Sequence, residues 1–489
     1  MSVKSQDNVD AIVVGGGAVA LAIALELVLR GVKLTNVFPV AGDSTAASRA
    51  AGAMLGAFGE VSADDGHDEA IEFDFRLAAQ RLFPSWLETI KELGKLPIFQ
   101  SRGTFIVANN HGVRDRDAIL LMKKRADERA EPAEWVEPSD VPGLNPCKPD
   151  IPSRCLYLAN EHSINPGELL DAIKATLEKH ENYRWINAEV MQISRVGEEW
   201  AAKLSDGTSV SAGSAVLAGG ARTVECLSDE LAADAGVPEM YFGKGVACIL
   251  SDAPEVPSTI RTPNRAFSCG IHVVPRPGRG NLYLGATNFL VQNKDIDTRV
   301  QPAELHGLFD DTIHQLNTHL RTSRIEEIRV GFRPITMFRR PAIGRTSLPN
   351  LYLATGTYRN GILMAPLMAE IIAHEMGVRS APPTIENPYS VSKRETNSNS
   401  IDRIMQIGVR DIVAFLQEPN NPLPYDRSGE LEDYLRTLFS LVMNDNAGSE
   451  ELRNAIRKRI AEAPFSETMH MLYYDLVKQA VERRSRNVA

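Results

Sequence analysis

Residues 10–30 of the 489-residue chain read DAIVVGGGAVALAIALELVLR. The short apolar run Asp10–Val14 is rich in β-branched residues and predicts a buried parallel strand. The run Leu21–Arg30 is rich in alanine and leucine, which favour helix, and Gly31 can end that helix. The glycines between the two runs therefore predict a tight connection from a strand into a helix.

This connection fits the dinucleotide-binding fingerprint G-x-G-x-x-G/A. Gly15 lets the chain turn sharply, Gly17 lets a pyrophosphate approach the backbone, and Ala20 is small enough for close helix–strand packing. The backbone N–H groups of Ala18 and Val19 open the helix and can donate to phosphates. The alternative is a glycine-rich turn without a ligand. The position between a strand and a helix favours nucleotide binding.

Composition and charge limit the class of protein. A chain of 489 residues is too long for one simple core, so about two or three domains are expected. The net charge of −10 argues against a nucleic-acid or anionic-membrane partner. The five cysteines are scattered without a C-x-x-C motif, which fits a reducing cytoplasm without disulfides or structural zinc.

We expect the N-terminal region to be neither an export signal nor a membrane anchor. Asp7 and Asp10 remove the basic start that a signal peptide needs, and three consecutive glycines argue against a spanning helix at residues 11–29. His374-Glu375 lacks the second histidine of the H-E-x-x-H motif, and no metal site is predicted. We therefore expect a cytoplasmic protein without a membrane partner.

The region after the first helix lacks one residue of the usual dinucleotide-binding pattern and contains a stretch that suits contact with a ligand. The second strand is predicted at Val32–Phe38, but its end lacks the acidic residue that usually holds an adenosine ribose. Asn36 or Asp43 could replace it. Residues 44–57 are mostly small and suit a backbone lying against a flat, bulky ligand, with Ser48, Arg49, Ala51, Gly52 and Met54 as contacts. A small-residue contact between helices is the alternative.

The remaining pattern predicts an α/β protein, with a Rossmann-like nucleotide-binding domain interrupted by an antiparallel-sheet substrate domain. A helix at 69–96 is expected to break at Pro84. The apolar run Ser214–Leu217 ends at Ala218 and Gly219 and is expected to return to the first sheet. The predicted units are residues 8–62, 165–230 and 331–380 for the nucleotide-binding domain, 63–164 for connecting helices and a substrate-domain segment, 231–330 for the antiparallel sheet, 381–400 for a linker and 401–489 for a C-terminal helical extension.

A second site motif lies within residues 331–373. It begins Gly331-Phe332-Arg333-Pro334 and continues through the run Thr357–Pro366, which predicts a strand, a glycine-bearing loop and a helix. The N–H groups at the start of that helix, near Gly361–Leu363, can stabilise an anion. A reduced flavin carries such negative charge.

These motifs together resemble the D-amino acid oxidase superfamily of FAD enzymes, and within it the glycine oxidases. The resemblance covers residues 8–378 and includes Val274-Pro275-Arg276 and Gly285-Ala286-Thr287. It implies that FAD is bound without a covalent link. The implied cofactor-binding residues are Gly15, Gly17, Ala18, Val19, Ala20, Ser48, Arg49, Ala51, Gly52, Met54, Val190, Ala218, Gly219, Gly356, Arg359, Asn360, Gly361, Ile362 and Leu363.

The resemblance also implies a reaction. Hydride would pass from the substrate Cα–H to flavin N5, the imine would hydrolyse to a 2-oxo acid and ammonia or an amine, and O₂ would be reduced to H₂O₂. Arg333 matches the family's carboxylate-binding arginine, and a guanidinium suits a carboxylate. A structural ion pair is the alternative for Arg333. Arg359 matches a second arginine beside the flavin.

Two positions depart from the glycine oxidase pattern. His272 stands where a substrate-contacting tyrosine is expected, and Asn288 stands where a methionine is expected. His272 is either a proton acceptor at neutral pH or a satisfied histidine in the sheet. The departures indicate a more polar pocket and a substrate other than glycine, such as an amino acid with a polar side chain.

Other functions stay open at this point. The flavin could pass electrons to an acceptor other than O₂, as in an amino or imino acid dehydrogenase. A flavoprotein monooxygenase would ordinarily show a Gly-Asp motif where this chain reads Ala354-Thr355-Gly356-Thr357. The apolar stripes of residues 401–489 predict helices that pack on the core, mediate self-association or bind a partner protein, so a flavin-holding partner subunit is a further alternative.

Overall fold

The computed structural model describes residues 9–40, 46–62, 67–109, 114–238, 240–265, 270–291, 297–336 and 340–391, together with Val409, Asp433 and Arg436. Apart from those three residues, the helical extension expected over 401–489 lies outside the described residues, as do residues 392–400 of the expected linker. Asp43, considered for the ribose, also lies outside them.

The nucleotide-binding half is built on one six-stranded sheet, which is parallel except for its edge strand β20. Distant segments of the chain meet in it, because β1 pairs with both β2 and β13. The predicted return of the Ser214–Leu217 strand to the first sheet is confirmed. In order across the sheet the strands are β20 (Ala342–Arg345), β21 (Leu351–Thr355), β13 (Ser214–Leu217), β1 (Ala11–Val14), β2 (Leu34–Val37) and β9 (Tyr183–Ile186).

Helices cover this sheet through one continuous apolar core. Helix α1 (Ala18–Leu29) is apolar on nearly all sides and packs on the sheet and against α8 (Gly361–Glu375) and α5 (Pro166–Leu177), and α3 (His67–Gly94) packs in turn on α8 and α5. A second core forms around the buried Trp200, where a small sheet of β10 (Val190–Val196), β11 (Glu199–Leu204) and β12 (Ser209–Ala212) packs. Helix α1 is thus enclosed, which explains its lack of a polar face.

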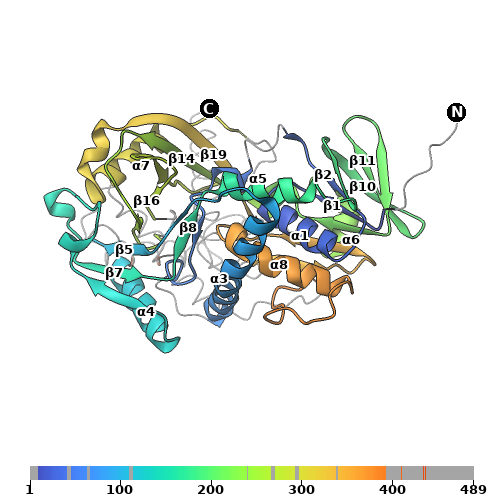
Figure 1. Cartoon of the computed structure of the whole chain (residues 1–489), viewed down its shortest axis with the longest axis horizontal. Coiled ribbons are helices and arrows are strands. Elements are labelled where there is room, and N and C mark those ends of the chain that lie inside the picture. The colour runs from blue at the N-terminus through green and yellow to red at the C-terminus, as the bar shows by residue number, and fades with distance from the viewer. Residues whose placement is uncertain are drawn as a thin grey trace, which may run out of the picture.

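The second half is a nine-stranded sheet that is antiparallel apart from the β15–β5 pair. Figure 1 shows this sheet on the left and the six-stranded sheet on the right, with α3 and α5 between them. Its strands are β5 (Thr104–Ala108), β6 (Ala133–Val136), β7 (Arg154–Leu158), β14 (Met240–Ser251), β15 (Thr259–Arg261), β16 (His272–Pro275), β17 (Leu282–Gly285), β18 (Phe289–Val291) and β19 (Arg324–Thr336).

Smaller elements complete this half. Helices α4 (Asp115–Glu128) and α7 (Pro302–Gln315) pack on the nine-stranded sheet. A three-stranded sheet joins β3 (Met54–Leu55), β8 (His162–Ile164) and β4 (Gln100–Ser101). The short helix α2 (Ala47–Ala50) lies against β19, and α6 (Asp229–Ala235) packs on the six-stranded sheet. The fold is therefore the predicted α/β class with a mainly antiparallel second sheet. Among the described residues, no helix combines the length and hydropathy that crossing a bilayer requires.

One prediction about a helix is wrong. Helix α3 continues through Pro84 and does not break there. Phe83 and Leu87 on either side are buried, and the proline itself lies on the exposed face. The helix residues before and after Pro84 pack on the same core, and this packing therefore outweighs the loss of one backbone hydrogen bond.

Candidate active site

A cavity of about 370 Å³ lies between the two sheets. The cavity is lined by residues at the carboxyl ends of β1, β2, β13 and β21 and by residues of strands β14, β16, β17 and β19, which together form its wall. Most residues predicted for the cofactor and substrate lie on this wall. They are Gly15, Gly17, Ala18, Val19, Ser48, Ala51, Gly52, Met54, Val190, Ala218, Gly219, His272, Arg333, Arg359, Asn360, Gly361, Ile362 and Leu363.

Three predicted cofactor residues are not on the wall. Ala20 is buried behind the wall, and a Cβ added at Gly15 would lie 3.1 Å from its Cβ. The small side chain of Ala20 therefore lets the helix pack closely on the turn. Arg49 points toward α5, because its Nη2 lies 2.6 Å from the Asp171 carboxylate. Gly356 has φ +75° and allows the turn after β21.

The glycine turn presents an open helix end to the cavity. Gly15 has φ +129°, and a Cβ there would lie 2.4 Å from the carbonyl oxygen of Ala218. Helix α1 has Gly17 at its N-cap, no capping side chain and no acidic residue in its first turn. Ala18 N–H donates to Ser48 Oγ at 3.0 Å. The remaining N–H groups and the positive helix end suit a pyrophosphate.

Helix α8 opens onto the same cavity. Its N-cap, Asn360, makes no side-chain capping hydrogen bond, and its first turn contains no acidic residue. Asn360, Gly361, Ile362 and Leu363 all lie on the wall. This second open helix end fits the anionic ring of a reduced flavin, so the residues present fit FAD.

The end of β2 does not supply a ribose acceptor. Asn36 is fully buried, and its amide donates to the carbonyl oxygens of Val13 at 2.9 Å and Gly15 at 2.8 Å. Asn36 is therefore committed to the sheet, and the sequence-based suggestion that it holds the ribose is not supported. The Phe38 ring packs over Gly16, where a Cβ would lie 2.4 Å away from it.

Acidic residues do line this part of the wall. Glu189 and Glu225 lie on the wall near Val190, and both pair with Arg222. They are the described carboxylates that could accept hydroxyl groups of an adenosine in place of a residue at the end of β2.

Arg333 is held by neutral groups. Its Nη1 donates to the carbonyl oxygen of Thr287 at 3.1 Å and to Asn288 Oδ1 at 3.0 Å. The guanidinium lies over Gly245, where a Cβ would be 2.4 Å from Nη2. No carboxylate of the described residues forms an ion pair with Arg333, so the alternative of a structural ion pair is not supported. The positive charge faces the cavity and can bind an anion.

His272 is a buried, neutral side chain on β16. Its Nδ1 lies 3.3 Å from the carbonyl oxygen of Gly270, and its ring stacks on Tyr283 with centroids 5.7 Å apart. Burial, followed by the charges of Arg261 and Arg333, lowers the pKa of His272 to about 3. The carbonyl can only accept, so Nδ1 carries the proton and Nε2 keeps a lone pair. His272 is thus a hydrogen-bond acceptor and a poor proton acceptor.

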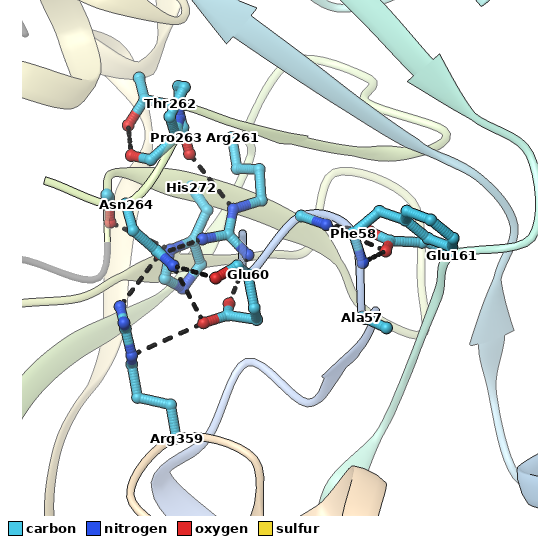
Figure 2. Close-up of polar contacts among 12 residues, drawn as sticks. Ala57, Phe58, Glu60, Glu161, Arg261, Thr262, Pro263, Asn264, His272 and Arg359 are labelled. Atoms are coloured by element: carbon cyan, nitrogen blue, oxygen red, sulfur yellow. Dashed lines mark hydrogen bonds and ion pairs between the residues drawn. The ribbon is translucent and has the colours of Figure 1, made fainter. Parts of the chain in front are cut away.

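A buried charged network that the sequence did not reveal lies next to His272. Figure 2 shows Arg261, Asn264 and Arg359 directed at Glu60. Glu60 Oε1 accepts from Arg261 at 2.6 Å, and Oε2 lies 3.2 Å from Asn264 Nδ2 and 3.6 Å from Arg359 Nε. Burial opposes ionisation, but the charges of Arg261 and Arg359 outweigh it and lower the pKa of Glu60 to about 2. Glu60 is therefore ionised at neutral pH.

A second buried carboxyl holds the turn that carries Glu60. Glu161 Oε1 accepts the N–H of Phe58 at 2.6 Å and the N–H of Gly59 at 3.0 Å. Burial raises the pKa of Glu161 to about 7, against the effect of these N–H groups. The only sequence signal for this arrangement is the position of Gly59-Glu60 directly after the small-residue stretch.

Comparison with known proteins identifies the family. Residues 10–375 match the family model described as FAD dependent oxidoreductase, the DAO family. The match covers most of the chain, so the protein belongs to this family and its cofactor is FAD. The resemblance to the D-amino acid oxidase superfamily is confirmed.

The individual proteins described next share 28% sequence identity or less with this chain. The bifunctional protein ThiO/ThiG of Trichormus variabilis is 28% identical over 382 residues, which cover 74% of this chain and 52% of that protein. The glycine oxidase of Bacillus licheniformis is 25% identical over 74% of this chain and 92% of its own length. The crystal structure of glycine oxidase from Geobacillus kaustophilus matches with a TM-score of 0.66 at 22% identity, over 79% of this chain and 99% of that chain. The chain thus spans about half the length of the bifunctional relatives, and the glycine oxidase structure confirms the fold.

Proposed function

We propose that the protein oxidises the primary or secondary amine of an amino acid. The observation that carries this proposal is Arg333, a cavity-facing guanidinium held by the Thr287 carbonyl and Asn288 rather than by a carboxylate. A cation in this setting binds the carboxylate of a substrate and orients its Cα. Bound FAD would supply the acceptor for the hydride, that is, for the hydrogen and two electrons that leave this carbon.

The proposed cofactor contacts follow from the two open helix ends. The first turn of α1, with Gly15, Gly17, Ala18 and Val19, would receive the pyrophosphate. The wall residues near Val190 would contact the adenosine, and the start of α8 at Asn360–Leu363 would face the flavin. Ser48, Ala51, Gly52, Met54, Ala218 and Gly219 would line the channel between these positions.

The chain's own residues would bind and orient the substrate. Arg333 would hold the carboxylate, and His272 Nε2, which keeps its lone pair, would accept a hydrogen bond from the amine. Because the pKa of His272 is about 3, it would orient the neutral amine rather than remove its proton. Arg359, fixed by Asn264 at 3.0 Å, would complete the cationic side of the site.

We base the proposal for the later steps, hydrolysis of the imine and reoxidation of the cofactor, on the resemblance to the glycine oxidases. The imine would hydrolyse to a 2-oxo acid and ammonia, or to an amine from a secondary-amine substrate. O₂ would reoxidise the cofactor and form H₂O₂. A dehydrogenase of the same fold would use another acceptor.

The proposal is tested by anaerobic reduction of the bound flavin. Purified protein is mixed with amino acids, N-methyl amino acids and simple amines, and bleaching of the flavin absorbance is followed. We expect bleaching only by amines that carry a carboxylate, and formation of H₂O₂ when air is readmitted. If no amine bleaches the flavin, amine oxidation is refuted. Reoxidation only by an added artificial acceptor would instead indicate a dehydrogenase.

A matched pair of variants tests the role of Arg333. Arg333→Ala should keep FAD and raise KM for a carboxylate substrate about 10- to 100-fold, since a hydrogen bond to a charged group contributes about 1.5–3 kcal/mol. Arg329 lies on the same strand but pairs with Glu327 at 2.8 Å, outside the cavity wall. Arg329→Ala should therefore leave KM near that of the wild type. Equal KM values for both variants would contradict the assignment.

A further inference from the structure

Arg276 is a buried cation behind the cavity wall. It directly follows strand β16, is 6% exposed and does not itself line the cavity. Its Nη2 donates to the carbonyl oxygens of Ala51 and Gly52, both at 3.2 Å, and its Nη1 donates to that of Pro275 at 3.2 Å. Its Nε is buried and has no hydrogen-bond partner among the described residues. The guanidinium is therefore held by backbone carbonyl groups, two of which belong to the wall.

The charge of Arg276 has no counter-ion in direct contact. No carboxylate of the described residues forms an ion pair with it, and its guanidinium carbon lies 4.9 Å from the centroid of the Tyr283 ring. Glu168 and Arg329 act on it from a distance and with opposite signs. Burial lowers the pKa of Arg276 to about 10, so the side chain is still charged at neutral pH. Such a buried charge is costly, and a nearby anion would offset part of the cost.

The backbone that Arg276 holds is a strip of the cavity wall, residues 50–53. Tyr283 Oη donates to the carbonyl oxygen of Ala50 at 3.0 Å, so Arg276 and Tyr283 together hold three successive carbonyl groups. Ala53 has φ +52°, a conformation that residues other than glycine seldom adopt. These contacts therefore fix the strip in a shape that its own residues do not favour.

Holding these carbonyl groups also orients N–H groups. The peptide bonds of the strip are trans, and in a trans peptide the C=O and N–H bonds point in opposite directions. The N–H groups of Gly52 and Ala53 belong to the two peptide groups that Arg276 holds, so they point away from Arg276. Both residues lie on the cavity wall, and neither N–H has a hydrogen-bond partner in the described part of the chain. Arg276 thus turns two donors toward the cavity.

The strip connects the two ends of the cavity. Just before it, Ser48 Oγ accepts the N–H of Ala18 at the start of α1 at 3.0 Å. At its other end, a Cβ at Gly52 would lie 3.3 Å from Nε2 of His272. FAD that extends from the first turn of α1 to the substrate would therefore pass along the strip, with Arg276 on the opposite side of the backbone.

We propose that Arg276 is a positioning residue for FAD that favours the reduced, negatively charged flavin over the oxidised flavin. It acts through the N–H groups that it directs at the cofactor and through its own charge behind the strip. Negative charge on the reduced flavin offsets part of the cost of burying the guanidinium, whereas the neutral oxidised flavin does not. Loss of this charge should therefore lower the reduction potential of the flavin. The inference depends on FAD binding and not on the identity of the substrate.

Two variants that differ in charge test this inference. Arg276→Gln and Arg276→Lys both keep a side chain that can donate to the carbonyl groups of the strip, but only the lysine variant can keep the positive charge. The two-electron midpoint potential of the bound flavin is measured in each holoenzyme by anaerobic reduction beside a reference dye. We expect Arg276→Gln to lose about 10-fold or more in affinity for reduced FAD relative to oxidised FAD, which lowers the potential by about 30 mV. Arg276→Lys should have a potential closer to that of the wild type.

Arg279 supplies a matched control. It lies on the same turn after β16, is exposed and is not on the cavity wall, so Arg279→Gln should leave the potential unchanged. If Arg276→Gln loses FAD during purification, titration of its apoprotein with oxidised FAD and, without oxygen, with reduced FAD gives the same ratio of affinities.

The possible results separate a redox role from a structural one. An unchanged potential in Arg276→Gln would overturn the inference, even if both forms of FAD bind more weakly, because weaker binding alone reflects only a structural role. Equal potentials in Arg276→Gln and Arg276→Lys would also overturn it. A lowered potential in Arg276→Gln, together with a wild-type holoenzyme that no amine reduces, would retain this inference and refute amine oxidation.

Discussion

Replacing Glu161 by glutamine should make the protein more stable at alkaline pH. Burial raises the pKa of Glu161 from 4.5 to about 7, so the folded state keeps its proton over a range where the unfolded chain has lost it. The stabilisation is fully present below pH 4.5 and is lost as the pH rises through 7. One pKa unit corresponds to about 1.4 kcal/mol, so the total loss is about 3 kcal/mol.

The amide of the variant resembles the protonated acid and does not titrate. Its oxygen can accept the N–H groups of Phe58 and Gly59, as Glu161 Oε1 does. We therefore expect wild type and Glu161→Gln to unfold at similar urea concentrations at pH 4.5. At pH 9 the variant should be more stable by about 3 kcal/mol.

The assay is urea unfolding of the holoenzyme, followed by tryptophan fluorescence at several pH values. Comparing the two proteins at each pH removes the contribution of every other titrating group. An independent check is the infrared band of a protonated carboxylic acid, which should disappear in the variant at pH 5. A difference in stability that stays constant from pH 4.5 to 9 would refute the buried, protonated Glu161.

Three further substitutions test other features. Gly245→Ala should raise KM for the carboxylate substrate about 10-fold or more while FAD stays bound, because the new Cβ would lie 2.4 Å from Nη2 of Arg333; steady-state kinetics with an unchanged KM would contradict this. Gly15→Ala should yield protein with little FAD, because its Cβ would lie 2.4 Å from the carbonyl oxygen of Ala218, and the ratio of flavin to protein absorbance measures the loss. Pro84→Ala should increase the free energy of unfolding by about 1–3 kcal/mol, since proline is unfavourable inside helix α3; a decrease measured by urea unfolding would show that the proline has a favourable role.

Local sequence signals predict the nucleotide-binding half well. The turn at Gly15 and Gly17 requires residues without a Cβ, and such a requirement is visible in the sequence itself. The short buried strands are recognisable by their apolar runs, and the start of α8 by the glycine-bearing loop before it. These features depend on neighbours in the chain.

The pairing of the site arginines with Glu60 could not be predicted, because it depends on contacts between distant segments, although Arg333 and Arg359 themselves are predicted from their motifs. Glu60 and Arg261 are 201 residues apart in the chain and meet through the nine-stranded sheet. Likewise Arg49, predicted for the cofactor, turns to Asp171 on α5, and Asn36 turns into the sheet. Residue type alone does not tell which way such a side chain points.

The order of strands in the six-stranded sheet has a consequence for folding of the protein during translation. Strand β1 is complete at Val14, but β13 begins at Ser214 and β21 at Leu351. At a translation rate of about 5–20 residues per second, β21 is synthesised roughly 20 to 70 s after β1. The apolar edge of the nascent sheet therefore stays unpaired for that time, and the cavity wall is complete only once α8 has been synthesised.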